Sequence, residues 1–119
     1  MLGLRTTIYK VADLEKAKAW YTQAFEVAPY FDQPFYVGFN IGGFELGLDP
    51  DGATIAKKTD NVITYWGVTD IHKEFDRLIS LGAIEHQSPT NVGGEIMVAS
   101  VNDLWGNVIG IIFNPEFKL

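Results

Sequence analysis

The chain has 119 residues, a length that suits one compact domain and excludes most multidomain enzymes. Fifteen acidic against nine basic residues give a net charge of −6, which disfavours nucleic acid as a partner because phosphates repel an acidic surface. Cysteine is absent, so disulfides, thiolate nucleophiles and cysteine zinc sites are excluded. The only histidines are His72 and His86. No apolar run reaches the length of about 18 residues that a membrane span needs, and residues 1–10 do not resemble a signal peptide. We therefore expect a cytoplasmic protein with no membrane partner.

The first half of the sequence predicts a strand, a helix and three more strands. Residues 4–11 are rich in the β-branched and aromatic side chains that strands favour. Asp13 is a suitable N-cap for the amphipathic helix that follows, and Pro29 ends that helix. Gly42-Gly43 supplies a tight turn between the last two strands. The three strands are expected near Tyr30, across 35–41 and across 44–48.

The second half repeats this pattern after a polar, turn-rich stretch at 49–60, which predicts a connecting loop. Asp70 is the second N-cap, and Gly82 stands where the second helix is expected to end. Strands are predicted across 62–68, 84–86, 95–101 and 108–113.

The two halves align with each other around their helix starts. Val11-Ala-Asp-Leu corresponds to Val68-Thr-Asp-Ile, so the N-cap residues Asp13 and Asp70 lie 57 positions apart. This repeat predicts an α+β fold of two βαβββ modules in a single domain over 1–119. Module 1 covers about 1–50, a linker about 50–60, and module 2 about 61–119. Pairing the modules would give a curved mixed sheet around a cleft, with the helices outside.

The paired pattern resembles the vicinal oxygen chelate superfamily. That superfamily includes glyoxalase I, extradiol dioxygenases, fosfomycin-modifying enzymes and bleomycin-binding resistance proteins. The resemblance covers nearly the whole chain, and its most specific parts are Phe-Glu-Leu-Gly-Leu at 44–48 and Asp-Leu-Trp-Gly-Asn-Val-Ile-Gly at 103–110.

The resemblance implies four metal-ligand positions, one on each of four strands, usually occupied by His or Gln, Glu, His and Glu. In this chain the positions fall at Thr6, Glu45, Ile63 and Gly110, so only Glu45 matches. Ile63 has no donor atom, Gly110 has no side chain, and a threonine hydroxyl is a poor ligand for zinc or nickel. We therefore expect no metal and no cofactor.

The remaining cleft residues predict a pocket for a flat or apolar small molecule. Strand alternation points one set of side chains into the cleft together with Glu45. That set is Thr6, Ile8, Lys10, Gly47, Ile63, Tyr65, Gly67, Val108, Gly110 and Ile112. Phe35, Tyr36, Phe39 and Trp105 are near enough in sequence to supply stacking faces at the rims. The resulting hypothesis is metal-independent binding of a small aromatic or amphipathic molecule, as in the bleomycin-resistance type of the family.

Two alternatives stay open. A carboxylate in an apolar cleft is expected to have a raised pKa, so a glyoxalase-like lyase or isomerase could use Glu45 as acid or base, or an atypical metal site. Glu45 could equally be only structural, hydrogen-bonded to Thr6 or Tyr65. The resemblance also implies a homodimer, and the aromatic side chains could then serve the subunit interface. We expect His72, His86 and Lys57-Lys58 to be exposed to solvent.

Overall fold

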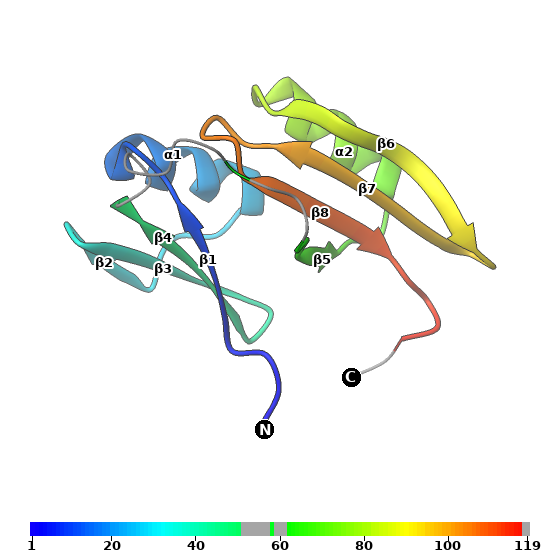
Figure 1. Ribbon diagram of the computed structural model, residues 1–119, viewed down its shortest axis with the longest axis horizontal. Helices are drawn as coiled ribbons and strands as arrows, with labels where there is room; N and C mark the ends of the chain where they lie inside the picture. Colours follow the sequence, from blue (N-terminus) through cyan, green and yellow to red (C-terminus); the bar gives the residue numbers. More distant parts are fainter. Residues whose placement is uncertain (51–57, 59–61, 118–119) are drawn as a thin grey trace. The chain divides into compact units, whose positions relative to one another are not determined.

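A computed structural model describes residues 1–50, 58 and 62–117 (Figure 1). The chain divides into two compact units, Met1–Lys57 and Lys58–Leu119. Most of the predicted linker, at 51–57 and 59–61, lies outside the described residues. Neither helix in the described part of the chain is long and apolar enough to cross a membrane.

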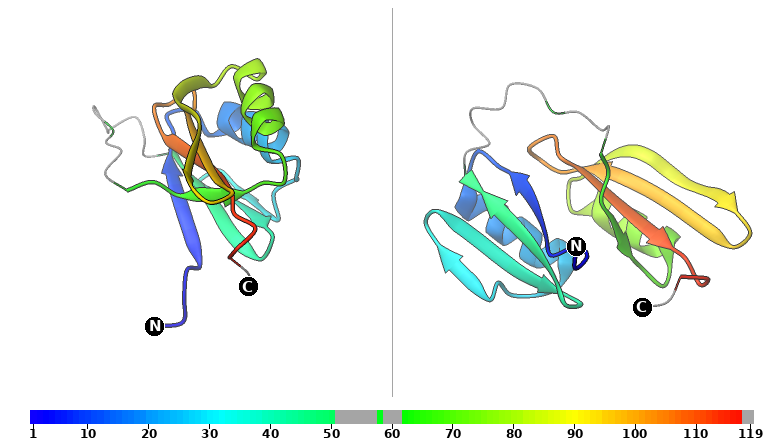
Figure 2. Two further views of the ribbon diagram at one scale, coloured as in Figure 1. Left: turned by 90° about the vertical axis from the view of Figure 1, so that its right-hand side faces the viewer. Right: turned by 60° about the horizontal axis from the view of Figure 1, so that its bottom comes forward.

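The first unit is one βαβββ module. Its elements are β1 (Thr6–Lys10), α1 (Leu14–Phe25), β2 (Phe31–Gln33), β3 (Tyr36–Ile41) and β4 (Phe44–Asp49). The strands form a mixed sheet in the order β1-β4-β3-β2, in which β1 runs parallel to β4 and the other pairs are antiparallel. Helix α1 packs against β3 and β4 and covers one face of this sheet (Figure 2).

The second unit has the same topology. Its elements are β5 (Tyr65–Gly67), α2 (Ile71–Ser80), β6 (Ile84–Gly93), β7 (Ile96–Asn102) and β8 (Val108–Phe113). The strand order is β5-β8-β7-β6, with β5 parallel to β8. Helix α2 packs on β6, β7 and β8. The predicted α+β fold of two βαβββ modules is therefore confirmed.

Both helices begin as the repeat predicts. Asp13 and Asp70 have extended backbones, and the side chain of each accepts a hydrogen bond of 3.1 Å from the amide three residues later. Such a bond satisfies one of the free amides at the start of a helix. Helix α1 ends at Phe25, before Pro29, because the next residue, the C-cap Glu26, has a left-handed φ of 57°.

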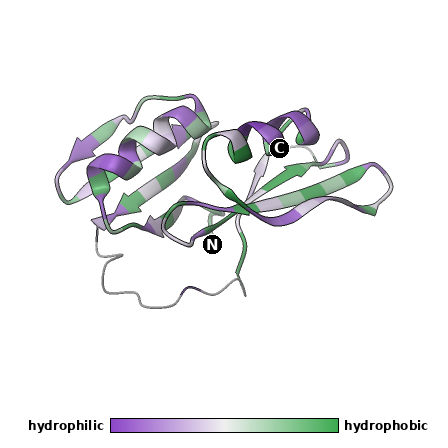
Figure 3. Ribbon diagram, turned by 90° about the horizontal axis from the view of Figure 1, so that it is seen from above, coloured by the Kyte–Doolittle hydropathy of each residue, from purple (hydrophilic) through white to green (hydrophobic). Residues whose placement is uncertain are grey.

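The core of the first unit lies between α1 and its sheet. Apolar side chains repeat along one face of α1, and the alternation of hydrophobic and hydrophilic residues is visible in Figure 3. Tyr21 is fully buried, and its ring stacks on Tyr9 and Phe25 with centroids 5.8 Å apart in each case. The sheet contributes the fully buried Val37, Phe39, Leu46 and Leu48.

Two strands differ from their predicted lengths. Strand β5 covers only three residues of the predicted 62–68, whereas β6 continues to Gly93 instead of ending at His86. The polar residues and Pro89 in the second part of β6 are more typical of a loop than of a strand. The strand tolerates them because β6 lies at the edge of the sheet and pairs with β7 through register shifts.

Candidate functional site

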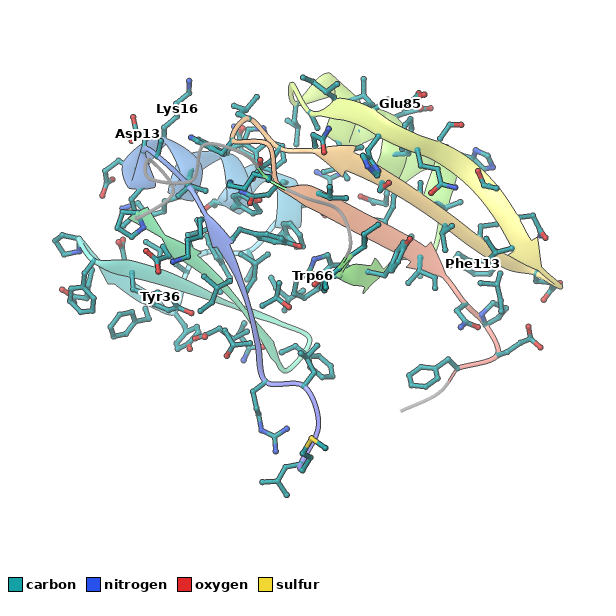
Figure 4. All side chains as sticks on the ribbon, in the orientation of Figure 1. Asp13, Lys16, Tyr36, Trp66, Glu85 and Phe113 are labelled. Carbon is teal, nitrogen blue, oxygen red and sulfur yellow. The ribbon has the colours of Figure 1, made fainter. Side chains whose placement is uncertain are left out.

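The carboxylate of Glu45 is the centre of a hydrogen-bonded group on the first sheet. Its Oε1 accepts bonds from Thr6 Oγ1 at 3.0 Å and from the Tyr36 hydroxyl at 2.8 Å. Its Oε2 accepts a bond from the Tyr30 hydroxyl. We call Thr6, Tyr30, Tyr36 and Glu45 the hydroxyl cluster; Tyr36 is labelled in Figure 4.

Strand register brings the cluster together. Thr6 on β1 is the direct partner of Glu45 on β4, and Gly38 on β3 is the partner of Gly47. Because partnered residues point to the same side, these positions share the face of the sheet opposite α1, which we call the open face. Ile8, the partner of Gly47, lies on the open face and is half exposed.

Two glycines make room for the tyrosine rings. A Cβ atom at Gly47 would collide with the hydroxyl end of Tyr36, and one at Gly38 would lie 2.9 Å from Glu45 and 3.3 Å from the Tyr30 ring. Gly47 faces the same side as Glu45, but the space over it is filled by Tyr36 and is not open to a ligand.

The hydroxyl cluster holds Glu45 ionised. The hydrogen bond from Tyr30 lowers the pKa of Glu45 most, the bonds from Tyr36 and Thr6 lower it further, and partial burial opposes them. The expected rise in the pKa of Glu45 is therefore wrong, because hydroxyl donors stabilise the charged form more than burial penalises it. Burial and the bond to Glu45 raise the pKa of Tyr36, so its hydroxyl remains a proton donor.

Aromatic rings lie beside the cluster. The ring centroid of Phe31 is 6.1 Å from that of Phe35 and 6.2 Å from that of Tyr36. Tyr30 is 62% exposed, Phe31 38% and Phe35 67%. The structure therefore places the Tyr30 ring at the carboxylate and the partly exposed Phe31 and Phe35 rings beyond Tyr36, an arrangement that can bind a flat ligand by stacking and polar contact.

Phe39 is not part of this aromatic surface. It is completely buried and pairs with Leu46, on the side of the sheet that α1 covers. Its prediction as a rim residue is wrong because Phe39 is three positions from Tyr36, and residues an odd number apart on a strand point to opposite faces.

The predicted site residues of the second unit lie on β5 and β8 and in the segments just before them. Tyr65 is 38% exposed, and its ring lies over Gly110, where a Cβ atom would come within 2.6 Å of it. Val108, Ile63 and Trp105 are each half-buried. A single cleft lined by residues of both units stays a prediction.

The strand before the second helix keeps the spacing of the first. The amides of Val11 and Val68, each two residues before a helix N-cap, donate to the carbonyls of Asp49 and Ile112. Ile63 is therefore as far from Asp70 as Thr6 is from Asp13, and its assignment as a former ligand position stays a prediction.

The turn at 103–107, part of the motif that carries the resemblance, has a structural role. Asp103 is buried, and its carboxylate accepts bonds from the Trp105 and Asn107 amides at 2.8 Å and from Asn107 Nδ2 at 2.9 Å. Lys58 Nζ donates to the Trp105 carbonyl and to Asn107 Oδ1, each at 3.0 Å. Lys58 was expected in solvent, but it is half-buried, and this burial lowers its pKa.

His86 also differs from expectation. It is half-buried, and its Nδ1 lies 2.7 Å from the hydroxyl of the fully buried Ser100. His72 is exposed, as predicted.

The residues present do not fit a four-ligand metal centre. Both oxygens of Glu45 accept hydroxyl hydrogens, and its strand partner Thr6 is one of the donors. Within 1–50, 58 and 62–117, no three acidic or histidine side chains gather closely enough to hold a metal ion. The hydroxyl donors stabilise the negative charge of the carboxylate, as a bound cation would in a metal site.

Comparison with known proteins decides the family. A family model described as the Glyoxalase/Bleomycin resistance protein/Dioxygenase superfamily matches residues 3–111. The chain belongs to this superfamily. The resemblance inferred from the sequence motifs is therefore confirmed.

Individual relatives agree with this assignment. The uncharacterized protein YurT of Bacillus subtilis is 36% identical over 77 residues, which cover 59% of this chain and 60% of that protein. A glyoxalase-related enzyme from Fulvimarina pelagi superposes with a TM-score of 0.78 at 19% identity, covering 100% of this chain and 93% of that one. The fosfomycin resistance protein FosX from Listeria monocytogenes, in complex with Mn(II) and sulfate, gives a TM-score of 0.81 at 16% identity, covering 98% and 93%. At these identities the structural matches show a shared fold.

Proposed function

We propose that this protein binds a small aromatic or amphipathic molecule without a metal, on the open face of the first sheet. The observation that carries the proposal is the hydroxyl cluster and the rings beside it. Glu45, Tyr30 and Tyr36 supply a fixed set of polar groups, and Phe31 and Phe35 supply apolar surface. Small-molecule sites commonly combine a few placed polar groups with apolar and aromatic walls.

The family supports a binding role. Its description includes bleomycin resistance proteins beside glyoxalases and dioxygenases. The state of Glu45 limits the glyoxalase-like lyase alternative. A general acid must carry a proton at working pH, and the hydroxyl donors lower the pKa of this carboxyl group, so Glu45 suits the role of a base and not that of an acid.

Titration calorimetry of chelator-treated protein tests the proposal. The probes are naphthalene and quinoline derivatives with neutral, cationic and anionic substituents. We expect at least one to bind with measurable heat in the absence of metal. Phe35→Ala should weaken that binding, because Phe35 offers an exposed ring that packs on Phe31, the neighbour of Tyr36 in the cluster.

Ile84→Ala is the matched control, because Ile84 is similarly exposed but lies on β6 in the second unit. It should leave the affinity unchanged. Two results would end the proposal: no heat from any probe, or binding that requires added nickel, zinc or manganese.

A further inference from the structure

The negative charge of Glu45 is not balanced by a basic side chain. Glu45 forms no salt bridge within the described residues, and its partners are three neutral hydroxyls. The nearby basic residues are engaged elsewhere. Lys10 pairs with Asp49 at 3.5 Å, Lys18 bonds two acidic side chains of α1 and β2, and Arg5 donates to backbone carbonyls of residues 2–4.

The cluster leaves one acceptor position on the carboxylate. An ionised carboxylate has about four lone-pair positions, two on each oxygen. Oε1 accepts two bonds, from Thr6 and Tyr36, whereas Oε2 accepts one, from Tyr30. The position that remains is therefore on Oε2, next to the Tyr30 ring.

The rings of Tyr30, Phe31 and Phe35 suit a positive charge. The faces of tyrosine and phenylalanine rings attract a cation through their quadrupole, and this attraction adds to that of a carboxylate. Tyr30 and Phe31 adjoin each other in sequence and are both partly exposed, and Phe35 packs edge-on against Phe31. An alkylated ammonium group would place its carbon atoms against these rings.

We propose that the ligand is a protonated tertiary amine carried on an aromatic or otherwise flat group. A tertiary ammonium has one N–H donor, which matches the single open position on Oε2, whereas a primary ammonium needs three acceptors. The flat part of the ligand contacts Phe31 and Phe35. This inference rests on the proposed function, because it names the class of molecule bound at the same face.

Five naphthalene probes separate the contributions of the positive charge, the N–H donor and the ring to the binding affinity. They carry dimethylaminomethyl, aminomethyl, trimethylammoniomethyl, hydroxymethyl and carboxymethyl groups on the same ring. We expect the dimethylaminomethyl compound to bind at least about tenfold more tightly than the neutral alcohol. This is the affinity that a hydrogen bond between its ammonium group and the Glu45 carboxylate should contribute. The quaternary compound should be weaker than the tertiary one because it has no N–H, and the carboxylate should be the weakest.

Glu45→Gln tests the role of the charge. It should lower the affinity for the tertiary amine about tenfold or more and change that for the neutral alcohol much less. Glu15→Gln is the matched control, because it removes the same charge from the exposed surface of α1 and should leave all affinities unchanged.

Tyr30→Phe tests the lone-pair count and does not depend on the stability of Glu45→Gln. It removes one donor from Oε2 and keeps the ring and the carboxylate charge. The ratio of primary-amine to tertiary-amine affinity should rise several-fold, because a second acceptor position opens. An unchanged ratio would contradict the count.

The two proposals fail in different ways. If the neutral alcohol or the carboxylate binds as tightly as the tertiary amine, the ligand class is wrong and binding at this face stands. If none of the five probes binds, and the wider aromatic panel also gives no heat, the proposed function itself is wrong.

Discussion

The two units share one topology but differ on the sheet face opposite their helix. In the first, the strand pair Thr6 and Glu45 carries a charged carboxylate with three hydroxyl donors. In the second, the parallel pair β5 and β8 places Tyr65 opposite Gly110, with no carboxylate at either position. The repeated framework therefore specifies where a site can form, and one strand position decides whether it is charged.

Both units lay a tyrosine over a glycine, but with different results. Tyr36 covers Gly47 and reaches Glu45, whereas the Tyr65 ring covers Gly110. The polar pair of the second sheet is His86 with the buried hydroxyl of Ser100. The open face of the first sheet thus carries a charged group at the pair of Thr6 and Glu45, whereas the second sheet is neutral at the pair of Tyr65 and Gly110.

The largest expected effect is a difference in stability between two alanine substitutions, at Phe35 and Phe39, which the sequence predicts at the same rim. Phe39→Ala should lower the free energy of unfolding by about 3–5 kcal/mol, since it leaves a cavity in the core under α1. Phe35→Ala should change it by less than about 0.5 kcal/mol, because Phe35 is mostly exposed. Chemical denaturation measures both. Equal losses from the two variants would contradict the assignment of Phe39 to the core.

A smaller effect distinguishes two glycines of the second unit. Gly110→Ala should lower the free energy of unfolding by about 1–3 kcal/mol, because the added methyl meets the Thr64 carbonyl at 2.8 Å and the Tyr65 ring. Gly67→Ala meets nothing within 4 Å, so we expect no loss, or a gain of up to about 1 kcal/mol from a less flexible unfolded chain. Thermal unfolding of both variants checks this contrast. A stable Gly110→Ala would show that Tyr65 does not need the space over residue 110.

The smallest expected effect is the pH dependence of the stability that Glu45 contributes. The folded state lowers the pKa of Glu45 below its ordinary 4.5, so its ionised form stabilises the fold. That contribution is fully present above the ordinary value and is lost as the pH falls through the lowered one. The stability difference between wild type and Glu45→Gln should therefore shrink on acidification. A difference that stays constant from about pH 7 to about pH 3 would contradict the lowered pKa.

Local patterns in the sequence predict the framework well because they act over short distances. The N-caps Asp13 and Asp70, the glycine turn at 42–43 and the repeat between the halves are confirmed by the structure. The expected homodimer stays a prediction, for which light scattering is the direct measurement.

The site itself depends on contacts between strands, which single-strand patterns do not contain. The role of Tyr30 was missed because its ring crosses β3 at Gly38 to reach Glu45. A glycine on the open face of a central strand is the signal that points to such a crossing. The direction of the pKa shift of Glu45 follows from these same contacts, so it could not be inferred from an apolar cleft alone.

The most direct test of the central claim is to map a bound ligand onto the two units by amide NMR, with metal-free protein and the dimethylaminomethyl naphthalene probe. We predict the largest saturable shifts at Gly38, Glu45 and Gly47 on β3 and β4, and their loss in Glu45→Gln. Saturable shifts centred on β5, β7 and β8, and unaffected by that substitution, would show that the binding site lies in the second unit and would contradict the account.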